Sequence, residues 1–119
     1  MTKPVLNEHT LKMARELRRA SRQHEAPIWK RISEDALKPS VARRTVNIRN
    51  IAKFTKDGDM VAVPGKVLGV GDIGHSVALF SFGISESAHA KIVGAGGRII
   101  DHNAMISERP TGSGVVLLG

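Results

Sequence analysis

The chain has 119 residues, of which 41% are hydrophobic and 24% are charged, and it contains no cysteine. This length suits one domain and excludes a two-domain dehydrogenase, and the lack of cysteine excludes disulfides and thiolate chemistry. Residues 1–56 carry 14 Lys and Arg against 5 acids, whereas residues 57–119 carry 4 against 6. We therefore expect a basic helical arm and connector at 1–56 and a mixed α/β core at 57–119, together forming one compact domain.

A cationic half joined to a nearly neutral half is typical of proteins that bind a polyanion, most often RNA or DNA. The alternative is a basic surface that is only solvated. The N-terminus has charges every few residues where a secretory signal would have an apolar run, and no stretch approaches the ~18 apolar residues of a membrane span. We expect a soluble, cytoplasmic protein that has no membrane partner.

The first helix is predicted at residues 7–23, with Asn7 as a candidate N-cap. At ~100° per residue its apolar side chains cluster on one face, namely Leu6, Met13, Leu17 and Ala20. A basic stripe lies roughly 150° away and consists of Lys12, Arg15, Arg19 and Arg22. Because the stripe has four cations and no anion, we interpret it as a phosphate-facing surface rather than a solvated one.

Two further helices are predicted in the basic half. One begins at Pro27, stops before Pro39, and turns four apolar side chains inward, namely Ile28, Trp29, Ile32 and Ala36. Residues 38–45 are expected to be a basic connector. Asn47 then caps a short helix that ends before the turn at Gly58, and the side chains expected to be buried are Ile48, Ile51 and Phe54.

From residue 60 onward the chain changes to short apolar segments, which predict strands. They lie at residues 60–63, 66–70, 76–82, 98–100 and 115–118. Between the third and fourth strands Ser85 can cap a helix that ends at Gly94, Gly96 or Gly97, and a helical turn is expected near residues 102–107. The fold class is therefore α/β, with a basic helical N-terminal extension.

Residues 69–74, GVGDIG, match the letters of the dinucleotide-binding fingerprint G-x-G-x-x-G. The fingerprint works only when it opens a helix, because the pyrophosphate sits on the free amides there, but Gly74 leads into a strand-like run. The preceding Gly65 and Lys66 lack the other residues of a phosphate loop. We interpret the glycines as residues that let strands turn, and we predict that neither NAD nor ATP binds.

The histidines and Ser113 do not match the sequence motifs of zinc sites or hydrolases. The histidines are His9, His24, His75, His89 and His102, and no two have the helical i, i+4 spacing of a zinc motif. Ser113 lacks the G-x-S-x-G context of a hydrolase nucleophile. We predict no enzyme, no cofactor, no metal site and no small-molecule substrate. All four aromatic residues fall on predicted apolar faces, so RNA contact is expected through Lys and Arg rather than through stacked bases.

Three stretches carry a resemblance to a known family, namely DGDMVAVPGKVLGVGDI, SFGISESAHAKIVGAGGRII and the closing PTGSGVVLLG. They resemble large-subunit ribosomal protein eighteen of archaea and eukaryotes, which shares its core with bacterial large-subunit ribosomal protein fifteen. The similarity covers nearly the whole chain, and the length matches the archaeal form. Its most specific parts are VPGKVLG and the pattern S-x-S-A-x-x-K-I-x-x-A-G-G at residues 85–97. The chain departs from the family at His75 and at His89–Ala90, where relatives often carry charged side chains.

The resemblance implies an irregular layered core of repeated β-β-α units, bound to large-subunit ribosomal RNA beside other ribosomal proteins and without catalysis. Twelve cations are predicted to bind RNA, namely Lys12, Arg15, Arg18, Arg19, Arg22, Lys30, Arg31, Lys38, Arg43, Arg44, Arg49 and Lys66. Two alternatives stay open at this point. One is a free-standing basic RNA chaperone or regulator, and the other is a small nucleotide-binding enzyme built on the glycine stretch.

Overall fold

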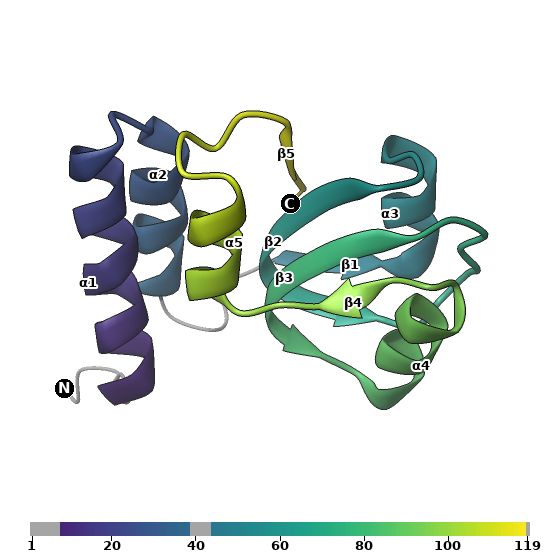
Figure 1. Ribbon diagram of the computed structural model, residues 1–119. Helices are drawn as coiled ribbons and strands as arrows, with labels where there is room; N and C mark the ends of the chain where they lie inside the picture. Colours follow the sequence, from purple (N-terminus) through teal and green to yellow (C-terminus); the bar gives the residue numbers. More distant parts are fainter. Residues whose placement is uncertain (1–7, 39–43, 119) are drawn as a thin grey trace, which may run out of the picture.

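The computed structural model describes residues 8–38 and 44–118 and has an α/β fold, which confirms the predicted class (Figure 1). In chain order the described elements are α1 (Glu8–Gln23), α2 (Pro27–Ala36), β1 (Arg44–Asn47), α3 (Ile48–Phe54), β2 (Asp59–Leu68), β3 (Val77–Ile84), α4 (Glu86–Gly94), β4 (Arg98–Ile99), α5 (His102–Glu108) and β5 (Val115–Leu117). Helices α1 and α2 lie at one end of the molecule, and α3 and α4 lie at the other.

One five-stranded sheet holds the described strands together, in the order β1-β2-β3-β4, with β5 also paired to β2. Every pairing between these strands is parallel. Parallel sheets are covered on both faces, so their central strands are apolar without interruption. The runs 60–63 and 77–80 fit this rule, because all of their residues are buried.

Alternate residues of the central strands build two separate cores. Met60 and Ala62 of β2 pack with buried side chains of α1, α2 and α5. The intervening Val61 and Val63 pack on the opposite face, with residues of α3 and α4. Since successive side chains of a strand point to opposite faces, one apolar run serves both cores, and the sheet becomes the middle of three layers.

Buried polar groups fix the α1–α2 hairpin in place. The Ser33 hydroxyl of α2 donates a 2.9 Å hydrogen bond to the Ala14 carbonyl of α1. The fully buried Trp29 donates from its indole Nε1 to the Pro110 carbonyl at 2.8 Å, which ties α2 to the segment after α5. A buried donor is costly unless it is paired, so these bonds specify how the hairpin sits on the sheet.

Several predicted boundaries are confirmed and others are wrong. The helices at α1, α2, α4 and α5 lie where the sequence predicts them, although Leu6 and Asn7 fall outside the described residues. The expected strands 60–63 and 66–70 are a single strand, β2, whose pairing with β3 shifts register between Val63 and Lys66. Proline has no N–H for the ladder, so the shift at residues 64–65 lets the strand continue past Pro64.

The expected connector at 38–45 is also partly wrong. Arg44 and Thr45 begin strand β1, which pairs with β2 from Arg44↔Gly65 to Asn47↔Leu68. Residues 39–43 of the connector lie outside the described part of the chain. The Asn47 N–H donates to Asn50 Oδ1 at 3.3 Å at the start of α3, as expected of a helix start there. Phe54, which was expected to be buried, is 56% exposed.

The glycine stretch is the connection between β2 and β3. Parallel neighbours need a crossover, which is usually a helix, but here residues 69–76 make the crossover alone. Ile73 packs against the core on the α3 and α4 side of the sheet. The predicted strand after Gly74 is confirmed as β3, so no helix follows the fingerprint letters.

Two glycines are needed because the crossover runs close to two helices. A Cβ on Gly69 would lie 1.9 Å from Ser87 Oγ of α4. A Cβ on Gly71 would lie 2.5 Å from Arg49 Cβ of α3, and Gly71 also has a φ of +95°. By contrast, Gly74 has open space around it and no positive φ. The prediction that these glycines let strands turn is therefore right for Gly71, whereas Gly69 serves close packing.

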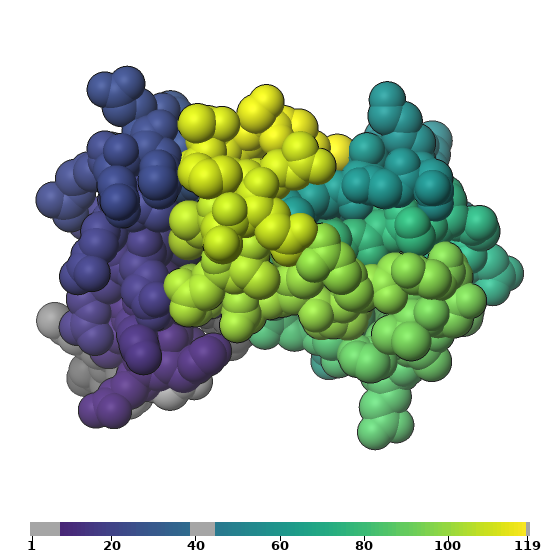
Figure 2. Space-filling view, in the orientation of Figure 1, coloured from purple at the N-terminus to yellow at the C-terminus, as the bar shows by residue number. Residues whose placement is uncertain are grey.

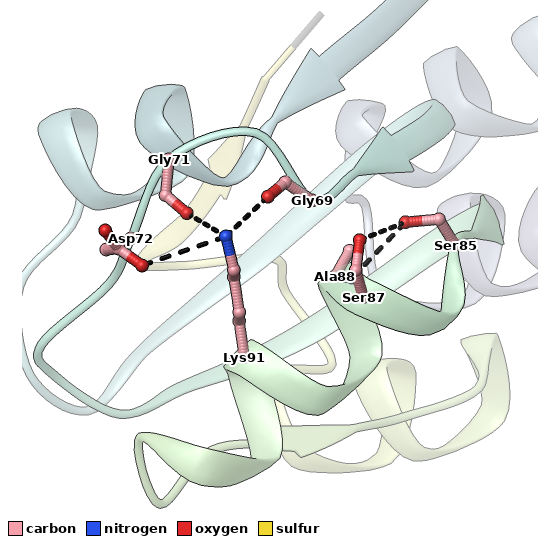
Figure 3. A network of polar contacts seen from close by, with 7 residues as sticks. All are labelled: Gly69, Gly71, Asp72, Ser85, Ser87, Ala88 and Lys91. Atoms are coloured by element: carbon pink, nitrogen blue, oxygen red, sulfur yellow. Dashed lines mark hydrogen bonds and ion pairs between the residues drawn. The ribbon is translucent and has the colours of Figure 1, made fainter.

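The side chain of Lys91 on α4 reaches the backbone of the crossover (Figure 3). Its Nζ donates to the carbonyl oxygens of Gly69 at 2.7 Å and Gly71 at 2.5 Å. The carbonyl between them, on Val70, accepts from the Arg49 N–H at 3.0 Å. The two motifs that carry the family resemblance thus form one structural unit, in which a glycine-rich loop is held through its backbone carbonyls by a lysine and a helix N-terminus.

Candidate nucleic-acid interface

Helix α1 presents its cations outward because its apolar face is docked. Met13, Leu17 and Ala20 are 7% exposed or less, and they pack in the core shared with α2 and α5. All five cations of the helix are exposed, namely Lys12, Arg15, Arg18, Arg19 and Arg22. The predicted assignment of the two helix faces is therefore confirmed for the described residues.

Four of these cations line one shallow groove. The groove is bordered by Arg15, Arg18, Arg19, Arg22 and Gln23. Among the described residues, no carboxylate lies within ion-pair distance of any of the four guanidinium groups. Arginine can hold a phosphate through two parallel hydrogen bonds, so four unpaired guanidinium groups side by side suit a phosphate backbone.

The acid of α1 that is nearest in sequence to the groove points elsewhere. Glu16 is three-quarters buried by its surroundings, and its Oε1 lies 3.5 Å from Nε2 of the buried His102 on α5. This contact joins α1 to α5 on the inner side of the helix. Glu16 therefore does not face the groove, and the other acid of α1, Glu8, lies in the first turn of the helix.

The cations of α2 have a different environment. Lys30, Arg31 and Lys38 are all exposed, but they border the same surface as Glu34 and Asp35. Lys38 Nζ lies 3.0 Å from Asp35 Oδ1, so one of the three cations is already paired. This mixed surface should attract phosphates less strongly than the groove of α1.

The remaining predicted cations are not gathered with α1. Arg43 lies outside the described residues, and of Arg44 only the backbone, in β1, is described. Arg49 on α3 and Lys66 on β2 are exposed. Helix α3 lies at the opposite end of the molecule from α1, with residues 101–118 across the middle (Figure 2). The structure thus separates the predicted site into a groove on α1 and more distant cations.

The sequence of the chain is similar to the sequences of known proteins. The chain is 33% identical to large ribosomal subunit protein eL18 of Methanococcus maripaludis over 112 residues, which is 94% of this chain and 93% of the relative. It is 43% identical to the protein of that name from Sulfurisphaera tokodaii over 74% of this chain and 75% of the relative. For the protein of that name from Archaeoglobus fulgidus the identity is 41%, over 82% and 84% of the two chains.

The chain belongs to the eL18 family. Identities above 30% over at least three-quarters of each relative carry this assignment. No family model matches the chain. The predicted family is thereby confirmed, and the relatives are ribosomal structural proteins rather than enzymes.

In this eL18 family member, several cations of the core half are used internally. Lys91 holds the crossover, and Arg98 forms an ion pair with Glu108 in which Nη1 donates to Oε2 at 2.9 Å. That pairing lowers the pKa of the Glu108 carboxyl and raises the pKa of Arg98. Two of the four cations in residues 57–119 are thus engaged by the protein itself.

The turn before β2 has its own polar network. The backbone N–H and the hydroxyl of Ser76 both donate to Asp57 Oδ1 at 3.0 Å. These two hydrogen bonds lower the pKa of the Asp57 carboxyl, with a smaller contribution from the nearby His75. His75 Nε2 lies 2.7 Å from Thr55 Oγ1, so this histidine makes an internal contact.

Sequence reasoning missed two exposed cations and one exposed ring, all near the end of α3. They are Lys53, Phe54 and Lys56. The signal was present in the spacing, because residues 48, 51 and 54 recur every third position and drift by ~60° per step around a helix. Phe54 therefore leaves the buried face that Ile48 and Ile51 occupy.

The described residues contain no cluster of three His, Asp or Glu side chains that could hold a metal ion. No described helix has the length and hydropathy needed to cross a bilayer.

Proposed function

We propose that helix α1 binds folded ribosomal RNA of the large subunit, with the groove of Arg15, Arg18, Arg19 and Arg22 against the phosphate backbone. The chain is a structural constituent of the large ribosomal subunit, as its family is, and it acts in the cytoplasm with the ribosome. There it lies among ribosomal RNA and other ribosomal proteins. Its contribution is to neutralise phosphates that RNA folding brings together.

The observation that carries this proposal is the row of four exposed, unpaired guanidinium groups on one side of a docked helix. Phosphate contacts position a protein on RNA without reading its sequence, and they require cations rather than a catalytic arrangement. The cations Lys12, Lys30, Arg31, Lys38, Arg49 and Lys66 add to the attraction from neighbouring surfaces. Arg43 and Arg44 complete the predicted set.

Co-sedimentation of the tagged full chain with large subunits tests the proposal. The wild-type chain should travel with large subunits at moderate salt and leave them only under stripping conditions. The double variant Arg15→Glu, Arg19→Glu should dissociate at lower salt. The matched control is Lys30→Glu, Arg31→Glu, which makes the same charge change on the mixed surface of α2 and should have a smaller effect.

Two outcomes would contradict the proposal. Wild-type protein found mainly in light, RNA-free fractions would favour a free-standing RNA chaperone or regulator. Equal loss in the two double variants would mean that net charge, and not the groove on α1, determines binding.

A further inference from the structure

Phe54 is an aromatic side chain that the fold leaves in solvent. Its relative exposure is 56%, whereas Trp29 and Phe80 are buried and Phe82 is partly buried against the core. These four are all the aromatic residues of the chain, and all are described. Phe54 belongs to neither core cluster. Single exposed apolar side chains are common on protein surfaces, so the case for a function rests on what surrounds the Phe54 ring.

The ring shares its side of α3 with positive charge. Ile48 and Ile51 face the core, and the exposed residues on the outer side of the helix include Arg49 and Lys53. Lys53 Nζ lies 5.5 Å from the centroid of the Phe54 ring. Lys56 is exposed two residues beyond the ring. Within the described residues none of these three cations has a carboxylate within ion-pair distance.

The end of α3 is also held rigidly. The Thr55 hydroxyl donates to the Ile51 carbonyl at 2.6 Å and contacts His75 Nε2 at 2.7 Å. At the other end of the helix, the Arg49 N–H donates to the carbonyl of Val70 in the crossover. A ring on a fixed helix loses little freedom when a ligand covers it, which favours binding.

We propose that Phe54 stacks on an unpaired base of the ribosomal RNA while Arg49, Lys53 and Lys56 hold the flanking phosphates. Aromatic rings among cations are how proteins bind unstacked bases, because every base offers a π face and the backbone offers charge. The inference rests on the proposed RNA-binding function and adds a second contact, at the end of the molecule away from α1. It also replaces the prediction that no ring of this chain faces RNA.

Three substitutions at one position test the stacking. Phe54→Leu keeps an apolar side chain but removes the π face, and it should weaken binding to purified large-subunit rRNA by on the order of 5- to 150-fold. Phe54→Tyr should bind as the wild type does. Phe54→Trp should also bind and, because Trp29 is buried, should add a fluorescence signal that rRNA quenches. The control is Val70→Ala, which truncates another exposed apolar side chain and should leave affinity unchanged.

The outcomes separate this inference from the function on which it rests. Equal affinity of Phe54→Leu and wild type, with the α1 variants still weakened, would overturn the stacking and leave the proposed function standing. Equal RNA affinity together with loss of Phe54→Leu from assembled subunits would mean that a neighbouring protein covers the ring. A wild-type chain without affinity for rRNA would instead overturn the proposed function. Thermal melts of all variants should agree, because Phe54 lies outside both cores.

Discussion

The guanidinium groups of α1 and the ammonium group of Lys91 on α4 have the same formal charge and opposite uses. Arg15, Arg18, Arg19 and Arg22 stand in solvent without a described acid beside them. Lys91 donates to two carbonyl oxygens of the crossover and lies 3.7 Å from Asp72. Counting charges cannot distinguish the two groups. What separates them is whether the fold supplies an internal acceptor: Lys91 has two carbonyl acceptors, whereas none is described for the guanidinium groups of α1.

The crossover should be the region most sensitive to small changes. Gly71→Ala places a Cβ 2.5 Å from Arg49 Cβ at a φ of +95°, so strain and overpacking together should cost about 2–5 kcal/mol. Gly74→Ala meets open space and should change the free energy of unfolding by less than about 0.5 kcal/mol. Urea denaturation of both variants measures the difference. Equal midpoints would show that α3 and α4 do not confine the crossover.

Lys91→Met should separate the two kinds of cation. The substitution leaves the carbonyls of Gly69 and Gly71 without their donor, which should lower the free energy of unfolding by about 1–3 kcal/mol. Its affinity for rRNA should stay close to that of the wild type under conditions where both are folded. Arg19→Ala should show the reverse, with weaker RNA binding and an unchanged melt. If both variants lost both stability and RNA affinity, the result would contradict different roles for the two groups of cations.

A smaller effect is expected from Asp57, whose pKa is lowered by the hydrogen bonds from Ser76. A carboxyl with a lower pKa in the folded state stabilises the fold above its unfolded pKa, and this contribution is lost as the pH falls through the folded pKa. Asp57→Asn should therefore be less stable than the wild type near neutral pH, and the gap should close in acid. Ser76→Ala, which removes one of the two donors, should show part of the effect. A gap that is constant with pH would contradict this assignment.

The sequence alone was enough to predict features that depend on residues close together in the chain. The stripe on α1, the cap at Ser85 and the strand after Gly74 all follow from local spacing, and each lies where it was predicted. Strand β1 was not predictable in this way, because its four residues are stabilised by pairing with β2. The acceptors of Lys91 lie 20 and 22 residues away in the chain, so only the tertiary structure reveals that this cation is engaged.

Phe54 shows a different limit. Its position three residues after Ile51 suggested burial. Three residues fall short of a full helical turn by ~60°, so Phe54 lies outside the buried face and its ring is exposed. The predicted stripe on α1 shares Arg15, Arg19 and Arg22 with the groove, which contains Arg18 in place of Lys12. The weaker α2 surface could also have been predicted, because Glu34 and Asp35 are helical neighbours of Lys30 and Lys38.

The central claim is that the basic stripe of α1, which shares Arg15, Arg19 and Arg22 with the groove, holds phosphates, and the salt dependence of RNA binding tests it most directly. Affinity of the full chain for large-subunit rRNA should be titrated against salt for the wild type and for single Ala variants of Lys12, Arg15, Arg19 and Arg22. Each variant should reduce the slope of log affinity against log salt by about 0.7–0.9, because each loses one phosphate contact and so releases fewer counterions on binding. The thermal melt should not change. Glu16→Gln, the control on the inner side of the helix, should not weaken binding. Unchanged slopes for all four variants would make the stripe a solvated surface and contradict the claim.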